Sequence, residues 1–208
     1  PVRFLREQVG TDVFIAGFQY QKGWAAEIIK SIVSNFFVAV HRERLVVKVD
    51  GAEINRITLS DHLKKCFAGD PNCYSEQFYE CMTSEGSASH IEDFNGLGEV
   101  ALFVRRDKNG PKKVAMFRQT GMLIKEKGHF RTPIRFAGVF EARGDALNER
   151  LRSLEPPGHD DWQPDRSSDD QEEIDQARKL LKTLYSWIND KVKQSIQMEE
   201  TEEVDAAG

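Results

Sequence analysis

Residues 10–18 read GTDVFIAGF, residues 24–40 read WAAEIIKSIVSNFFVAV and residues 45–49 read LVVKV. The apolar residues of the middle segment are Trp24, Ile28, Ile29, Ile32, Val33, Phe36, Phe37 and Val40. Their period is near 3.6, which predicts a helix with one wide apolar face turned inward. The flanking segments are short apolar runs typical of strands. The sequence therefore predicts a βαβ unit over residues 10–49, and this unit contains no pattern of reactive side chains.

The composition is that of an ordinary soluble protein. With 208 residues, of which 39% are apolar and 30% charged, the chain can form one core with a small appendage. No run is apolar enough to span a bilayer and no secretory leader is recognisable, so we expect no membrane association and a cytoplasmic location. The chain begins with Pro1 and enters a predicted strand directly, from which we expect a fragment of a longer protein.

The three cysteines do not form a metal-binding or disulfide pattern. Cys66, Cys73, Cys81 and His90 are separated by seven, eight and nine residues, without the close pairs that bring two ligands to one zinc ion. As nucleophiles, these thiols have no marked basic partner close in the sequence. We therefore expect reduced thiols and no metal site, and a cysteine or zinc enzyme is the weakest of the functional hypotheses.

The rest of the chain contains segments with the apolar period of helices and segments with that of strands. Residues 52–58 predict a short strand, and helices are predicted from Ser60 to Cys66 or Phe67 and over residues 75–83, followed by a flexible loop at 84–89. From Gly98 the pattern predicts consecutive strands over residues 99–106, 113–119, 120–131 and 133–144. The Asn-Gly-Pro core of residues 107–112 predicts a hairpin that joins two adjacent antiparallel strands.

These elements divide the chain into four parts. Residues 1–157 predict one α+β domain, which ends with a helix over residues 145–154. Residues 158–170 form a connector rich in Pro and Asp, residues 171–198 a long amphipathic helix, and residues 199–208 a disordered acidic tail. The segment from His159 to Trp162 could support acid–base chemistry, but a hydrated loop with Trp162 anchored on the domain is the simpler explanation.

The charge distribution suggests one function. Residues 101–143 are strongly basic and the chain after Gly144 is acidic. A basic sheet surface can contact phosphates, so we expect, as one alternative, a nucleic-acid-binding module that uses Arg105, Arg106, Lys112 and Lys113. The other interpretation is the solvated face of a two-sided sheet. No P-loop and no GxGxxG motif occurs, so no nucleotide-binding motif is present in this chain.

Three segments carry a family resemblance: GTDVFIAGF together with NFFVAV, then VAMFRQTGMLI at 114–124, and LRSLEPPGHDDW at 151–162. They resemble the region that follows the ATP-binding domain in large bacterial GHKL ATPases, a superfamily that includes MORC proteins, MutL and gyrase B. The similarity covers most of residues 10–190. It implies a transducer domain with a ribosomal-protein-like α+β fold, antiparallel strands and a βαβ unit, followed by a long C-terminal helix.

The same resemblance implies a function without turnover in this chain. A transducer couples the ATP state of a preceding GHKL domain to dimerisation or to an effector, and a sheet-loop cation contacts the γ-phosphate. Arg118, Lys112 and Lys113 are the candidates for that cation, with Arg118 preferred because its segment carries the resemblance. ATP and Mg²⁺ would belong to the parent protein, and this chain would hold no cofactor. The expected partners are that ATPase domain and a second copy, and bacterial proteins of this kind suggest DNA-related or phage-defence processes.

Overall fold

The structure is a computed structural model that describes residues 17–18, 21–68, 70 and 72–205. Within these residues, five strands form one sheet in the order β3-β4-β7-β5-β6 and two further strands form a separate hairpin. The strands of the sheet are β3 (Ala88–Asp93), β4 (Glu99–Arg106), β5 (Lys113–Phe117), β6 (Leu123–Lys127) and β7 (Phe136–Ala142). The hairpin consists of β1 (Val47–Val49) and β2 (Ala52–Ile54).

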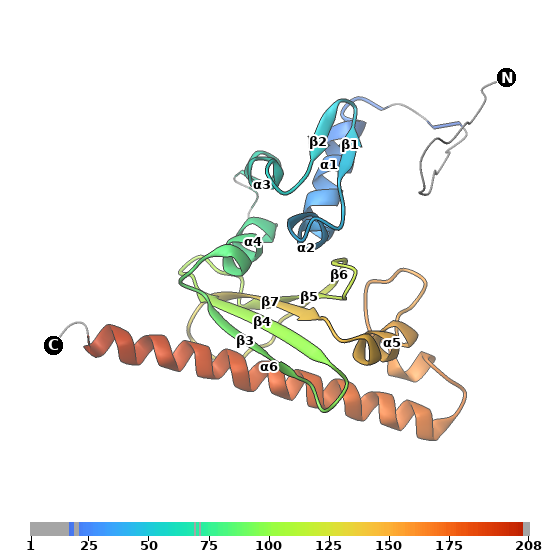
Figure 1. The fold of residues 1–208 in the computed structure, drawn as a ribbon, viewed down its shortest axis with the longest axis vertical. Helices are drawn as coiled ribbons and strands as arrows, with labels where there is room; N and C mark the ends of the chain where they lie inside the picture. The colour runs from blue at the N-terminus through green and yellow to red at the C-terminus, as the bar shows by residue number, and fades with distance from the viewer. Residues whose placement is uncertain (1–16, 19–20, 69, 71, 206–208) are drawn as a thin grey trace.

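Helices cover both faces of the sheet, as Figure 1 shows. The helices α1 to α4 lie on one face, and the long helix α6 runs across the other, with α5 at the end of the sheet where β7 finishes. Their bounds are α1 Trp24–Asn35, α2 Phe37–His41, α3 Leu59–Phe67, α4 Ser75–Thr83, α5 Asp145–Ser153 and α6 Gln171–Asp205, with a short 3₁₀ turn at Pro164–Arg166. The predicted α+β class, with antiparallel strands and a long C-terminal helix, is confirmed.

The sheet separates two hydrophobic cores because successive side chains of a strand point to opposite faces. In β5, Val114 and Met116 pack with the α6 residues Leu184 and Ile188, whereas Ala115 and Phe117 face the other way. That second core is formed with α2, α3 and α4. β7 is buried along its whole length, as expected for the central strand of a sheet covered on both faces.

The predicted N-terminal helix is interrupted and only partly buried. It breaks at Phe36, whose φ of −129° lies outside the helical region, so the chain forms α1 and then α2. The α2 side chains are buried, but within α1 only Val33 is fully buried and Ile28 remains 36% exposed. The strand predicted at 45–49 is β1, which pairs with β2. Of the strand predicted over residues 10–18, only Gly17 and Phe18 belong to the described residues.

The predicted hairpin between residues 99–106 and 113–119 is wrong. β7 lies between β4 and β5, antiparallel to β4 and parallel to β5. The loop over residues 107–112 instead packs on the start of β7, where the amide of Lys112 donates to the carbonyl of Phe136 at 2.9 Å. The turn residues Asn109 and Gly110 predicted a reversal of the chain, but they carry no information about β7, which begins 26 residues after Gly110 and pairs between the two strands.

Two other boundaries also differ from the sequence prediction. β3 begins at Ala88 inside the predicted flexible loop and pairs with β4, and β2, α3, α4 and β3 follow one another in a βαβ-like order. The backbone of α6 continues to Asp205, where the sequence predicted an end near Met198, and residues 206–208 lie outside the described part. Residues 199–205 contain no proline or glycine, so no helix-breaking residue ends α6 within this segment.

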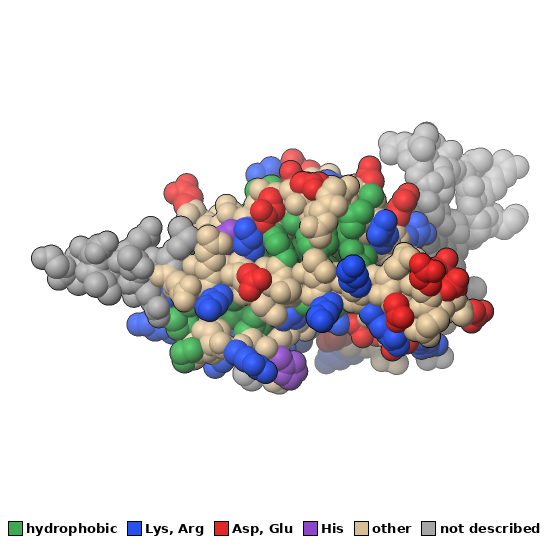
Figure 2. All heavy atoms as spheres, turned by 90° about the horizontal axis from the view of Figure 1, so that it is seen from below, with side chains coloured by type: hydrophobic (Ala, Val, Ile, Leu, Met, Phe, Trp, Pro, Cys, Tyr) green, Lys and Arg blue, Asp and Glu red, His purple; other side chains and the backbone are tan. Residues whose placement is uncertain are grey.

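The outer face of α6 is mixed in charge. Figure 2 shows this face: acidic side chains gather where the helix begins, separate Lys and Arg side chains follow along its middle, and apolar side chains appear in strips on either side. This pattern matches the sequence, because Glu172, Glu173 and Asp175 are in the first turns of α6.

Candidate functional site

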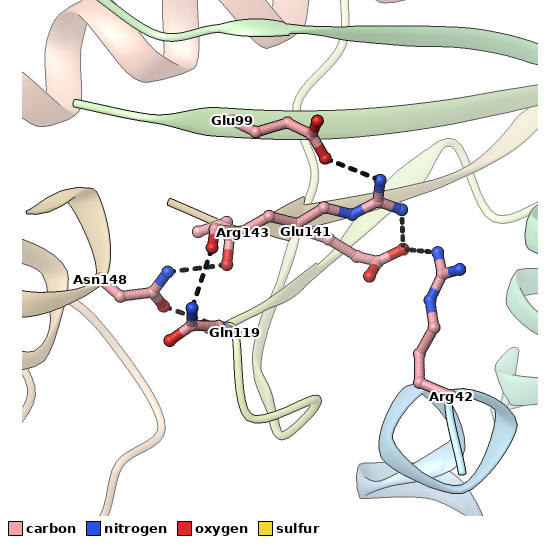
Figure 3. Close-up of polar contacts among 7 residues, drawn as sticks. Arg42, Glu99, Gln119, Glu141, Arg143 and Asn148 are labelled. Carbon is pink, nitrogen blue, oxygen red and sulfur yellow. Dashed lines mark hydrogen bonds and ion pairs between the residues drawn. The ribbon is translucent and has the colours of Figure 1, made fainter. Parts of the chain in front are cut away.

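A buried carboxylate joins the N-terminal helices to the sheet. Glu141 of β7 is 5% exposed, and its Oε1 lies 2.8 Å from Nη2 of Arg42 and 3.1 Å from Nη2 of Arg143 (Figure 3). Arg143 also contacts Glu99 of β4 at 3.0 Å. A buried charge is tolerated only when it is paired, so these contacts hold α2 against the sheet at the end of β7.

The loop between β5 and β6 is fixed at the same end of the sheet. The side-chain amide of Gln119 donates to the carbonyl of Arg143 at 3.0 Å and to the carboxylate of Asp145 at 2.6 Å. Asn148 of α5 accepts from the backbone amide of Gln119 at 2.8 Å (Figure 3). On the other side, Gly121 lies so close to Ala39 that an added Cβ would be 2.5 Å from the Ala39 nitrogen. The loop is therefore anchored to α5 and α2 together.

Arg118 is in this loop and forms an ion pair with a fully buried carboxylate. Its Nε lies 3.0 Å from Oε1 of Glu155, and the two side chains are 13% and 0% exposed. The Nε–H does not point along this line, so the guanidinium Nε has no hydrogen-bond partner within the described structure. Glu155 also contacts Nδ1 of His159 at 2.9 Å and accepts from Nε1 of Trp162 at 3.4 Å. A buried donor without a hydrogen bond is uncommon in proteins, and here the ion pair with Glu155 compensates its charge.

Arg118 lines a polar cleft of about 570 Å³. Thr120, Arg152 of α5 and His159 contribute a hydroxyl and two further basic groups to the same cleft. His159 has a φ of +52°, an uncommon conformation for a residue other than glycine. The guanidinium groups of Arg118 and Arg152 can each bind an oxyanion such as a phosphate, and the carboxylates of Asp145 and Glu149 line the same cleft and offset their charge. The full lining is Arg118, Gln119, Thr120, Asp145, Asn148, Glu149, Arg152 and His159.

The other two candidate phosphate contacts lie elsewhere. Lys113 is the first residue of β5 and Arg118 follows the last, so the strand separates them by roughly 16 Å. The ammonium of Lys113 pairs with Glu126 at 2.7 Å and lies over the ring of Tyr74. Lys112 has a φ of +57° in the loop that precedes β5. Arg118 therefore lies at the opposite end of β5 from Lys112 and Lys113, and the three residues do not form one site.

The residues of the nucleic-acid alternative lie at that other end of the sheet. Arg105 and Arg106 end β4, next to the beginning of β7. Arg105 is paired with Glu80 of α4 at 2.9 Å.

The cysteines do not form a reactive or metal-binding centre. Cys81 is completely buried, and its thiol donates to the carbonyl of Ala137 at 3.2 Å. Burial raises the pKa of Cys81 to about 12, and burial also raises the pKa of Cys66. No group of three His, Cys, Asp or Glu side chains placed to hold a metal ion occurs among the described residues.

Sequence reasoning missed two contacts that join distant segments. One is the ion pair of Arg118 with Glu155, a residue that the sequence placed only in a break between elements. The other is His90 of β3, whose Nε2 lies 2.8 Å from the hydroxyl of Ser195 in α6. This pair is not a nucleophile and its base, because Ser195 is 1% exposed and its hydroxyl donates to the carbonyl of Lys191. No local signal could have revealed a contact across 105 residues.

Comparison of the chain with protein-family models, with curated proteins and with solved structures found no match. Among the helices of the described part, none is long and apolar enough to cross a membrane.

Proposed function

We propose that this chain is a non-catalytic transducer module in which Arg118 reads the terminal phosphate of a nucleotide held by a neighbouring GHKL-type ATP-binding domain. The observation that supports this proposal is the ion pair of Arg118 with the buried Glu155 at the wall of an otherwise open polar cleft. The guanidinium of Arg118 lines this cleft, where an anion can approach it. ATP and Mg²⁺ are held by the partner domain on this proposal.

The contacts of Glu155 allow Arg118 to exchange this carboxylate for a phosphate. An isolated carboxylate in the interior is strongly unfavourable, so Arg118 could not leave Glu155 without a replacement. Nδ1 of His159 contacts the second oxygen of the same carboxylate at 2.9 Å. A phosphate that enters the cleft can therefore draw Arg118 away while His159 and Trp162 remain bound to Glu155.

The segment between α5 and α6, which contains Glu155, transmits this change to α6. Trp162, which donates to Glu155, is buried in the same core as Leu181 and Leu184 of α6. The ammonium of Lys125 contacts Asp161, and Arg178 of α6 pairs with Asp165 at 2.8 Å. A shift of Glu155 alters the position of Trp162 and hence of the beginning of α6. On this proposal α6 presents the nucleotide state to a second copy or to an effector, in a cytoplasmic, DNA-related or phage-defence process.

The test uses the protein in which this chain adjoins its ATP-binding domain. Arg118→Ala is expected to lower the rate of ATP hydrolysis by about 100-fold, the usual cost of losing one charge-stabilising contact to a transition state. Arg56→Ala is the matched control, because the Arg56 side chain is more than half exposed and lies between β2 and α3, outside the cleft that Arg118 lines. Equal rates for Arg118→Ala and the control would refute the proposal. A loss with Lys112→Ala or Lys113→Ala instead would assign the role to the other end of β5.

A further inference from the structure

The ends of four neighbouring strands meet at the end of the sheet opposite Arg118. β4 ends at Arg106, which is opposite Phe136, the first residue of β7. β5 begins at Lys113, opposite Ala137, and β6 ends at Lys127, opposite Val114. Residues 107–112 and 128–135 therefore form two loops at the same end of the sheet. Because neighbouring strands are about 4.8 Å apart, the ends of these four strands span roughly 14 Å.

These loops carry four Lys or Arg residues, one histidine and one acidic residue. The basic residues are Lys108, Lys112, Arg131 and Arg135, and no acidic side chain of the described residues forms an ion pair with them. The one carboxylate, Asp107, accepts from the backbone amide of Asn109 at 2.8 Å. In contrast, Arg105 and Lys113 are already paired with Glu80 and Glu126. We call Lys108, Lys112, Arg131 and Arg135 the basic edge.

The basic edge is held in place by backbone contacts. The amide of Asp107 donates to the carbonyl of Arg135 at 3.2 Å, and that of Lys112 donates to the carbonyl of Phe136 at 2.9 Å. Gly110 lies so close to β7 that an added Cβ would be 2.7 Å from the carbonyl carbon of Phe136. These contacts bring Lys112 beside Arg135. A ligand that binds here has little backbone to order, which lowers the entropic cost of binding.

The surroundings of the basic edge favour a phosphate backbone over a protein or a stacked base. Phe136 is fully buried, and it packs edge-on against Phe130 with ring centroids 5.1 Å apart, so neither ring is presented as a stacking platform. Lys127 is turned to the ring of Phe130, 3.9 Å from its centroid, rather than toward a ligand. None of the large exposed apolar side chains of the described residues is in these loops, and a protein interface needs an apolar centre.

We propose that the basic edge binds the phosphodiester backbone of nucleic acid, independently of base sequence. Arg105 and Lys113, two of the four residues that the sequence suggested, are engaged elsewhere, and Lys108, Arg131 and Arg135 take part instead. The contact is with phosphates, so its strength follows the number of cations and the salt concentration. This activity does not depend on Arg118 or on an ATP-binding domain.

The test measures fluorescence anisotropy of a labelled 20-base-pair duplex and of a labelled 20-nucleotide single strand, both of mixed sequence, with the full chain at several salt concentrations. Four phosphate contacts predict a slope of log K against log salt near about −3.6 for the duplex and about −2.8 for the single strand. The quadruple variant Lys108→Gln, Lys112→Gln, Arg131→Gln and Arg135→Gln is expected to lose at least about tenfold in affinity at low salt and most of the slope. The form that binds more tightly identifies the natural source of the phosphates.

The matched control removes the same charge elsewhere. Lys64, Lys65, Lys179 and Lys193 are all exposed and lie outside the basic edge, and their joint replacement by Gln should change the affinity by less than about twofold. Circular dichroism checks that both variants are folded. No binding by the wild-type chain, equal binding by both variants and the wild type, or equal losses in both variants would each overturn the proposal. Displacement of the duplex by polyglutamate at equal charge concentration would also overturn it, in favour of an acidic protein partner.

Discussion

The guanidinium Nε of Arg118 lies 3.0 Å from a carboxylate oxygen of Glu155, and the Glu155 side chain has no exposed surface. The two residues are 37 positions apart, in the β5–β6 loop and in the segment that directly follows α5. Their contact therefore closes the polar cleft on one side and also joins the sheet to the segment that leads into α6.

Removal of one partner of this pair should destabilise the fold strongly. Arg118→Met leaves Glu155 buried with His159 as its remaining basic neighbour, and we expect a loss of about 3 kcal/mol in the free energy of unfolding. The double variant Arg118→Met with Glu155→Leu should lose less than the single variant, because no uncompensated charge remains. Urea unfolding of the two single variants and the double variant measures this coupling. Additive losses would show that the pair does not act as a unit.

Glu141 should be equally sensitive to replacement. Glu141→Ala leaves Arg42 and Arg143 without the acid they share, and we expect a loss of about 3 kcal/mol in unfolding free energy. The pair of Arg56 and Glu43 is the control, since its atoms are 3.5 Å apart and both side chains are more than half exposed. Arg56→Ala should cost less than about 1 kcal/mol. Thermal unfolding of both variants tests this difference, which would disappear if Glu141 were merely a surface residue.

Gly121 should not tolerate a side chain. Its φ is +79°, and an added Cβ would lie 2.5 Å from the nitrogen of Ala39, so Gly121→Ala must displace α2 or the loop that carries Arg118. We expect a loss of at least about 2 kcal/mol in unfolding free energy, from backbone strain and disturbed packing. Gly128→Ala is the matched control, because no atom lies within 4 Å of its added Cβ. Similar melting temperatures for the two variants would contradict this account.

The fold should lose stability on mild acidification because two histidines resist protonation. Burial, followed by the charges of Arg42 and Arg56, lowers the pKa of His41. Burial and Lys191 likewise lower the pKa of His90. Between these lowered values and the ordinary value near 6.5, the unfolded chain binds protons that the folded chain does not, so the stabilisation is present above pH 6.5 and is lost as the pH falls.

Urea unfolding at pH 7.5 and pH 5.5 measures this dependence. The double variant His41→Gln with His90→Asn should show a smaller difference in unfolding free energy between the two pH values. The carboxylates of Asp70 and Glu92, whose pKa values are lowered, affect stability at more acidic pH and do not obscure the comparison. An unchanged pH dependence in the double variant would assign the effect to other groups.

The three thiols should differ in reactivity. Cys66 and Cys73 are partly exposed, whereas Cys81 is buried with a pKa raised to about 12. Under native conditions, iodoacetamide at pH 8 should modify Cys81 far more slowly than the other two, and all three should react in urea. Mass spectrometry of the digested protein identifies the modified positions. Rapid labelling of Cys81 in the native state would show that α4 opens away from the sheet.

The local elements followed from the sequence, but their arrangement did not. The helices α3, α4 and α5 and the beginning of α6 agree with the predicted spans, because apolar periodicity is a local signal. A side-chain cap contributes at α6, where Asp170 accepts from the amide of Glu172, but α3, α4 and α5 have no side-chain cap hydrogen bond. β3 was missed because its sequence, ASHIED, is polar and mostly exposed, and its strand conformation depends on pairing with β4. The apolar residues of β4 and β5 predicted strands correctly, yet no property of either strand shows that β7 separates them.

The candidate site was predictable only in part. Arg118 was selected from its sequence segment, and the structure places it at a polar cleft. Its relation to Glu155 was not predictable, because an ion pair across 37 residues has no periodic or compositional signature. The basic region was recognised from composition, but the separation of paired from unpaired cations required Glu80 and Glu126 to be located in space.

The position of β7 has a consequence for the synthesis of the protein. β7 is the last strand to leave the ribosome, yet it fills the centre of the sheet. At about 5 to 20 residues per second, roughly 2 to 7 s pass between the completion of β4 and that of β7. During this interval the inner edges of β4 and β5 have no native partner and can pair with another nascent chain. The order of the strands therefore makes the nascent chain most prone to aggregate through the edges of β4 and β5 that later pair with β7. A chaperone that covers these two edges would prevent that aggregation.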